Sequence, residues 1–460
     1  MSNLREFPLT AARWFLLANV VTAAWLYGGT REWSRTCISW LLIANTTLFV
    51  LGTTVRFRLP RIPLPAALGL GFLLLQGWFM TWNAKRHFID IAQIFLDQKH
   101  PLPNWPGFAD GSLVLPSMLL TTGLLGAFCI ACDMTANRIW HQRLWITLAS
   151  TGLSIVILGL AQRLTDAPSI FWDVEHNIGW TFFGVFRYHS NAGAFINLVL
   201  PLISSLALSA FLRKGNEKQS AFWILAALIT ASSGFVNVSR AANVICTLLL
   251  TGISVLLALV ITRHKKIKIW KIRTSITVGI LILAGTLAYS FGIEKTYLRW
   301  QSDSWQILRG DAGRAEAYEI MIRSAIPAAG AWGFGPGTFE QMFNIHRAQI
   351  HSTLQGRWVM GHSDALQTPM DWGLTGAAAW SLLLCGGLIS GLISTKKFWR
   401  QDRDASVLSA ACVFSLIGVM LHALVDFPLQ IASLQLFTLL ITSILWGNSS
   451  RKPKGLHKPV

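Results

Sequence analysis

The chain has few charged residues. Only 13% of its 460 residues are Asp, Glu, Lys or Arg, and 53% are hydrophobic. Soluble domains average roughly 25% charged residues, so about half of the usual charge is missing. The mean hydropathy of +0.48 agrees with this composition. These values exclude a soluble enzyme, a disordered chain and a disulfide-stabilised scaffold.

Several sequence signals are absent as well. The first segment, MSNLREFPLTAARWFLL, has no small-residue cleavage site, so we expect a retained helix rather than a signal peptide. The six cysteines all lie in or beside apolar stretches. Cys129-Ile-Ala-Cys132 has redox spacing but lies inside such a stretch, which favours buried, unreactive cysteines. The chain contains no H-E-x-x-H, no G-x-S-x-G and no internal repeat, and we expect neither a metal nor a cofactor.

Long apolar runs dominate the rest of the chain. About 20 apolar residues are needed to cross the ~30 Å hydrocarbon core of a bilayer as a helix. The runs predict an all-α, polytopic transmembrane bundle of about twelve spans, at residues 12–28, 36–54, 64–82, 113–133, 144–162, 190–211, 221–238, 241–262, 274–292, 373–394, 406–424 and 430–447.

The distribution of charge predicts the orientation of these spans. If the N-terminus is cytoplasmic, the inner segments hold 24 of the 39 Lys and Arg and five of the 21 Asp and Glu. The inner side then carries a net charge of +19 and the outer side −1, which together give the formal net charge of +18. The positive-inside rule therefore predicts cytoplasmic N- and C-termini. The basic excess is explained by topology and gives no evidence for nucleic acid binding.

The predicted spans divide the chain into three parts. Residues 1–162 form N-terminal transmembrane helices, residues 163–380 form a core region, and residues 381–460 form C-terminal transmembrane helices with a basic cytoplasmic tail. Within the core region, segment 293–372 is about 80 residues long and is the only loop large enough to fold over the membrane. We therefore expect any chemistry to occur on the outer side of the membrane.

Short amphipathic helices are predicted within segment 293–372. Tyr318, Met321, Ile322, Ala325 and Ile326 follow helical spacing and predict one apolar stripe, while Glu319 and Arg323 are spaced for an i,i+4 ion pair. Pro327 should end or kink this helix. The glycine-rich stretch 330–337 does not follow a strand, so we expect a tight turn rather than a nucleotide-binding loop.

Three arginines are candidates for binding an anionic ligand. Arg240 lies in a turn between two outward-meeting spans, Arg187 lies just before the sixth predicted span, and Arg314 opens the amphipathic helix. An arginine at a helix N-terminus opposes the helix dipole, which suits a nearby phosphate but also a solvated charge. Snorkelling to the membrane interface equally explains the other two.

His362 is the candidate general base. It lies beside Asp364, between Gly361 and the last long outward-to-inward span, and histidine can accept a proton near neutral pH. Asp364 is a supporting candidate that either orients the imidazole or, together with Ser363, caps the following helix. A surface or packing histidine remains the alternative.

Four ordered segments resemble the O-antigen ligase and polymerase superfamily of bacterial membrane glycosyltransferases. The resemblance covers roughly residues 180–380, and the first 160 residues match only in being hydrophobic. Its segments are Phe186-Arg-Tyr-His-Ser-Asn-Ala-Gly193, Val238-Ser-Arg240-Ala-Ala, Arg314 ahead of Pro327 and Gly333-Phe-Gly-Pro-Gly-Thr-Phe339, and His362-Ser-Asp-Ala-Leu366 followed by Asp371-Trp-Gly-Leu-Thr-Gly376. The chain departs from the family at Tyr188-His-Ser-Asn191, where Asn-x-Asn is frequent, and at Asp371, where Glu is frequent.

The resemblance implies glycosyl transfer on the outer face of the inner membrane. An undecaprenyl-diphosphate-linked glycan is the implied donor, and a lipid or glycan hydroxyl is the implied acceptor. Arg240, Arg314 and, more weakly, Arg187 would bind the diphosphate, His362 would be the base, and Asp364 and Asn191 would support the site. No metal is required if arginines stabilise the leaving group.

Two other functions are compatible with the sequence. A polysaccharide polymerase of the same superfamily is the nearest alternative. A transporter or flippase without catalysis is an alternative of another class, and it is disfavoured because the spans carry few charges and show no inverted repeat.

Overall fold

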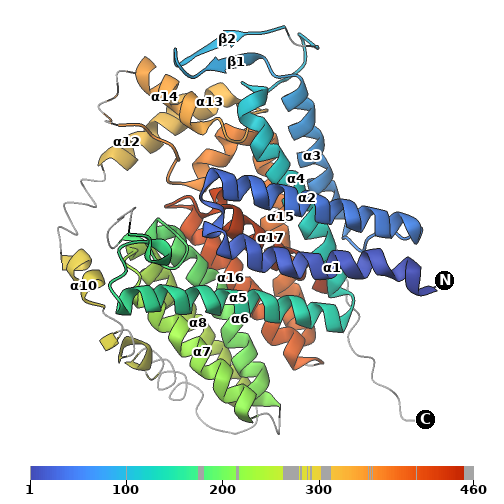
Figure 1. The fold of residues 1–460 in the computed structure, drawn as a ribbon, viewed down its shortest axis with the longest axis vertical. Coiled ribbons are helices and arrows are strands. Elements are labelled where there is room, and N and C mark those ends of the chain that lie inside the picture. Colours follow the sequence, from blue (N-terminus) through green and yellow to red (C-terminus); the bar gives the residue numbers. More distant parts are fainter. Residues whose placement is uncertain are drawn as a thin grey trace.

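The protein is an almost wholly helical bundle (Figure 1). The structure, a computed structural model, describes residues 2–99, 101–174, 181–213, 217–262, 279, 282–286, 289–290, 293–301, 312–350, 352, 354, 356–399 and 401–449. Among these residues, ten helices are long and apolar enough to cross a membrane. They are α1 (Ser2–Trp25), α2 (Glu32–Val55), α3 (Leu64–Trp82), α4 (Gly111–Thr135), α5 (Arg138–Leu164), α6 (His189–Leu212), α7 (Glu217–Val236), α8 (Arg240–Thr262), α15 (Asp364–Phe398) and α16 (Arg403–Ala423). The predicted multi-pass helical membrane protein is confirmed at this level.

Two of the twelve predicted spans are not among these ten helices. The span predicted at residues 274–292 lies largely outside the described residues. The span predicted at residues 430–447 coincides with α17 (Ala432–Ser449), which is buried against α4 and α15. The total number of spans therefore stays a prediction.

Helix α6 is the most enclosed of the ten and lies between α5, α7, α8 and α16. Small residues allow this close packing, because helices in a membrane approach most closely where side chains are short. A Cβ atom on Gly193 would lie 2.3 Å from the Cβ of Ala242. This contact places the first turns of α6 and α8 side by side.

A small β-hairpin covers one end of the bundle, a feature that the all-α prediction lacked. Strands β1 (Arg86–Ile89) and β2 (Ile94–Asp97) pair antiparallel. The hairpin is attached through the buried Asp110, whose Oδ1 accepts hydrogen bonds from Ser112 N and Leu113 N at 2.6 and 2.9 Å and so caps α4. The other oxygen of Asp110 accepts a hydrogen bond from Phe88 N, in β1.

The long segment before the last helices contains short helices with a separate apolar core. They are α10 (Glu294–Gln301), α12 (Ala312–Ile320), the π-helical turn η4 (Met321–Ala325), α13 (Ile326–Ala329) and α14 (Phe339–Gln349). The core is formed without α10 and contains Ala317, Ile320, Met321, Phe339 and Phe343. In Figure 1, α10 and α12 lie on the side of the bundle away from the start of α1. The amphipathic helices predicted in this segment are confirmed.

One detail of the predicted apolar stripe is wrong. Met321 and Ala325 are buried, but Ile322 is 55% exposed. Ile322 is the second residue of the π-helical turn, and Ala325, the last residue of that turn, is again on the buried face. The predicted ion pair between Glu319 and Arg323 is confirmed at 2.9 Å.

The glycine-rich stretch forms a tight turn that packs against a kink in α15. Gly373 interrupts this helix with φ 67° and ψ −179°, at the residue where the membrane span was predicted to begin. Phe334 N donates to Met370 O at 2.9 Å, and Gly335 N donates to Asp371 O at 2.8 Å. A Cβ on Gly333 would lie 2.3 Å from Gly373 N, so only glycine permits this approach. The turn fixes the kinked first part of α15, which follows His362.

Candidate functional site

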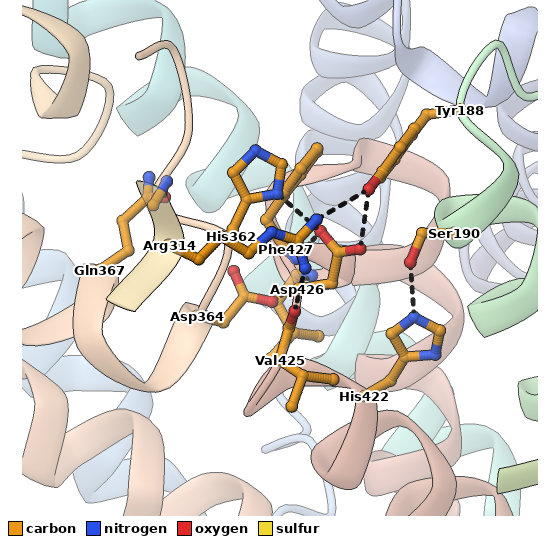
Figure 2. Close-up of polar contacts among 12 residues, drawn as sticks. Tyr188, Ser190, Arg314, His362, Asp364, Gln367, His422, Val425, Asp426 and Phe427 are labelled. Carbon is orange, nitrogen blue, oxygen red and sulfur yellow. Dashed lines mark hydrogen bonds and ion pairs between the residues drawn. The ribbon is translucent and has the colours of Figure 1, made fainter. Parts of the chain in front are cut away.

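Four segments that are distant in the sequence meet at Asp426 (Figure 2). Asp426 lies between α16 and the short 3-10 turn η5 (Pro428–Gln430). Its Oδ1 lies 3.2 Å from His362 Nδ1, and its Oδ2 accepts a hydrogen bond of 3.2 Å from the Tyr188 hydroxyl. The same hydroxyl accepts a hydrogen bond of 3.3 Å from Arg314 Nη2. We call Tyr188, Arg314, His362 and Asp426 the polar network.

Arg314 contacts the turn that carries Asp426 at a second point. Its Nη1 donates to Val425 O at 3.4 Å, and the side chain is half-buried. The apolar face of α12 holds this residue in place, because Ala317 and Ile320 are buried in the core of the long segment. A guanidinium group is thereby fixed next to the His362–Asp426 pair.

His362 is held in an uncommon backbone conformation. Its φ is +49°, in the left-handed region that few residues other than glycine adopt. Two hydrogen bonds stabilise it, from the Tyr318 hydroxyl to His362 O and from Gly361 N to Gln367 Oε1. Such outliers persist where the surroundings determine them, and they are frequent at functional sites.

Aromatic rings enclose the imidazole of His362. The ring centroid of Phe427 lies 5.0 Å away and that of Trp358 lies 5.7 Å away. Phe427 in turn stacks on Tyr188, with centroids 5.5 Å apart. These contacts limit the rotation of the imidazole, while 27% of the His362 side chain remains exposed. The ring is therefore both oriented and accessible.

The electrostatics of the network favour an ionised carboxylate beside a neutral phenol. Burial raises the pKa of Asp426, but hydrogen bonds from His362 and Ser190 and the nearby His422 outweigh burial and hold its pKa below the ordinary value. Burial, followed by the charge of Asp426, raises the pKa of Tyr188 to about 12. An ionised Asp426 accepts a hydrogen bond from the protonated Nδ1 of His362. The lone pair of Nε2 is then available as a base.

Asp364 does not contact the imidazole of His362, which was one of its two predicted roles. The carboxylate that binds the imidazole is Asp426, not Asp364. The Asp364 side chain accepts hydrogen bonds from Leu429 N at 2.8 Å and from Gln430 Nε2 at 2.9 Å, and Asp364 N donates to Asp426 O at 3.1 Å. Asp364 is also the first residue of α15, and Ser363 makes no side-chain capping bond. Asp364 thus stabilises the turn that presents Asp426.

The other predicted residues lie around the polar network. Arg240 is half-buried at the start of α8, three residues after Asn237, whose Nδ2 donates to His189 O at 3.0 Å. The turn of Arg240 is therefore next to the start of α6, where Tyr188 lies. Arg187 directly precedes Tyr188 and is exposed, and Asn191 is buried in the first turn of α6.

Sequence reasoning missed Asp426 and the role of Tyr188. Asp426 lies in a short turn between two predicted spans, in a chain with only 21 acidic residues, and an acid at such a turn was a signal that could have been used. A second buried pair, Ser190 Oγ and His422 Nε2 at 2.8 Å, joins the start of α6 to the end of α16. No pattern in the sequence indicates that contact.

Comparisons with protein families and with characterised proteins gave no match to this chain.

The geometry defines the chemistry that the site can support. A histidine oriented by a buried carboxylate is the arrangement of a general base. A nearby arginine provides planar hydrogen-bond donors for a phosphate or carboxylate. The combination suits the transfer of a group to a hydroxyl from a donor whose leaving group is an anion.

Proposed function

We propose that the protein is a membrane glycosyltransferase of the O-antigen ligase type. In this proposal it moves an oligosaccharide from an undecaprenyl-diphosphate carrier to an acceptor hydroxyl on the periplasmic face of the bacterial inner membrane. The observation that carries the proposal is the His362–Asp426 pair, 3.2 Å apart, with Arg314 joined to the same carboxylate through Tyr188.

The reaction assigns a step to each part of the site. His362 Nε2 takes the proton of the acceptor hydroxyl, and the acceptor oxygen attacks the anomeric carbon of the donor. The bond from that carbon to the diphosphate oxygen breaks, and the diphosphate leaves with its electron pair. Arg314 and Arg240 stabilise the negative charge of the leaving group with forked hydrogen bonds. A single displacement of this kind inverts the anomeric centre.

A lipid-linked donor also needs an apolar surface close to the charged site. A cavity of about 540 Å³ has a mostly apolar surface, to which Phe235, Val244, Tyr289 and Tyr297 contribute, and Glu294 lies in its lining as well. It lies beside the first turns of α8, where Arg240 is located, because Asn243 and Thr247 also line it. A polyprenyl chain in this cavity would bring its diphosphate to Arg240, which supports a lipid-linked donor.

A reconstituted assay tests this function. The full-length protein in liposomes receives a labelled undecaprenyl-diphosphate oligosaccharide and, in separate reactions, lipid A core or a second repeat unit as acceptor. A single addition to lipid A core supports the ligase. A ladder of products supports the polymerase, the alternative within the same superfamily. Movement of donor across the membrane without transfer would overturn the proposal in favour of a transporter.

A further inference from the structure

A second cavity, with a more polar lining than the first, lies beside the polar network. The chemistry proposed above does not use it. Its volume is about 270 Å³, close to the ~300 Å³ lower limit of small-molecule pockets. Helices α2, α4, α15 and α17 contribute its walls, and residues 336–340 and 359–360 contribute to its lining. Met360, two residues before His362, and Leu429 and Gln430, just after Asp426, line it as well.

Unpaired polar atoms gather around this cavity. Among the described residues, Asp371 Oδ1, Gln435 Oε1, Thr438 Oγ1 and Arg35 Nε are buried atoms without a hydrogen-bond partner, and all four residues line the cavity. Asp371 is 3% exposed and Thr438 is 1% exposed. Native proteins leave few buried polar atoms unpaired, so four around one cavity indicate a polar occupant.

The kinds of group in the lining limit the chemistry of that occupant. Arg35 offers donors and Asp371 offers an acceptor, so a simple anion would face the carboxylate and a simple cation would face the guanidinium. A ligand with several hydroxyls satisfies both, because each hydroxyl donates and accepts. Trp372 and Trp380 add flat apolar surface to the same lining. These are the features that a sugar ring requires.

We infer that this cavity binds one sugar residue of the acceptor. The assignment of this sugar to the acceptor rests on the proposed function. The inference that the cavity binds a sugar does not depend on that function. The segment from Asp426 to Gln430 connects the imidazole to the cavity. Asp426 bonds to His362, while Leu429 and Gln430 line the cavity and donate hydrogen bonds to Asp364. A sugar in the cavity would therefore be placed next to the base.

Binding is tested with the full-length protein in nanodiscs by saturation-transfer NMR. The probes are the methyl glycosides of glucose, galactose, mannose and N-acetylglucosamine. We expect at least one probe to bind the unmodified protein. Affinity for that probe should fall roughly tenfold in both Asp371→Asn and Thr438→Val, because each variant loses a buried hydrogen bond to the ligand. Ser209→Ala is the matched control, since Ser209 Oγ is also buried and unpaired but lies in α6, outside the cavity.

Each outcome supports or overturns the inference. Binding that is lost in both cavity variants and kept in Ser209→Ala supports it, and this holds even if no glycosyl transfer is ever detected, in which case only the proposed function fails. Binding of no probe, or equal binding by all variants, overturns it. A rise in Tm caused by sodium chloride alone, and lost in Asp371→Asn, would also overturn the inference, because the cavity would then be a cation site. Thr438→Val keeps the test decisive if Asp371→Asn does not fold.

Discussion

The imidazole of His362 and the carboxylate of Asp426 lie 3.2 Å apart although 64 residues separate them in the chain. Asp426 is 5% exposed and His362 is 27% exposed, so the pair has a buried orienting group and an accessible base. Two other residues position the members of this pair. The hydroxyl of Tyr318 holds the backbone of His362, and Asp364 holds the turn that carries Asp426.

Replacing Asp426 with Asn should lower turnover by about 10²–10⁴-fold, the range for loss of general-base function. The amide can no longer stabilise the imidazolium or select the Nδ1-protonated form. Single-turnover kinetics on the reconstituted protein measure the effect. Asp364→Asn should be milder because it only weakens the support of the turn, and the exposed Asp97→Asn in the hairpin is the control for general damage. Near-normal turnover of Asp426→Asn would remove this carboxylate from the mechanism.

Arg314 and Arg240 should affect use of the donor. Changing either to Ala should weaken donor use strongly, and changing it to Lys should restore only part, because Lys keeps the charge but loses the forked geometry. Each charge-assisted hydrogen bond contributes about 1.5–3 kcal/mol. Turnover at several donor concentrations measures the change.

Arg323→Ala is the matched control for Arg314, because Arg323 is on the same segment but 78% exposed in a surface ion pair. Arg187→Ala should have the weakest effect of the three predicted arginines, since its side chain is exposed. If the Ala and Lys variants of Arg314 and Arg240 all keep normal donor use, these arginines only anchor the chain.

Asp426 and Tyr188 should each stay in one ionisation state across the neutral range. The folded pKa of Asp426 is lowered, so its contribution to stability is present above the unfolded pKa of about 3.9 and is lost as pH falls through the lower folded value. The folded pKa of Tyr188 is raised to about 12, so its contribution is present below about pH 10 and is lost as pH rises through 12.

Thermal unfolding of the unmodified protein and of Asp426→Asn tests this directly. The difference in Tm should be constant between about pH 5 and pH 8 and should shrink only below about pH 4. A difference in Tm that already disappears at pH 6 would show that Asp426 is protonated in the working range.

The orientation in the membrane can be tested with introduced cysteines. After replacement of the six native cysteines, Glu319→Cys in α12 should react with an impermeant thiol reagent in intact spheroplasts. Lys218→Cys, at the start of α7, should react only after lysis. The reason is the net charge of +19 on the predicted inner side against −1 on the outer side. The reverse labelling pattern would invert the topology.

The sequence predicted the helices better than it predicted the contacts between them. Length and hydropathy are local properties, so the ten membrane-length helices, which fall among the twelve predicted spans, and the short helices after residue 293 followed from the sequence pattern. The hairpin at residues 86–97 was missed because its strands are four residues each and only one of their side chains, that of Phe88, is buried. Ile322 was misplaced because helical spacing alone puts it on the same face as Tyr318 and Ala325, whereas its side chain is exposed.

The candidate site was predicted only in part, for a physical reason. His362 and Arg314 were recognised as titratable and charged side chains on a segment predicted to face outward. The structure places His362 against Asp426 and joins Arg314 to the same carboxylate through Tyr188. The identity of that carboxylate depends on how α16 and α15 pack, and the neighbour in sequence, Asp364, was the wrong partner for the imidazole. The contact between Tyr188 and Arg314 spans 126 residues and likewise depends on tertiary packing.

The central claim is that His362 takes a proton from the acceptor, and a single-turnover assay of His362→Gln beside a donor-binding assay tests it most directly. Glutamine can hydrogen-bond to Asp426 but cannot accept a proton. We predict that turnover falls by about 10²–10⁴-fold while donor binding stays near that of the unmodified protein, because the diphosphate is held by the arginines. Near-normal turnover of His362→Gln would contradict the claim and leave His362 a positioning group, and loss of donor binding together with folding would make the residue structural.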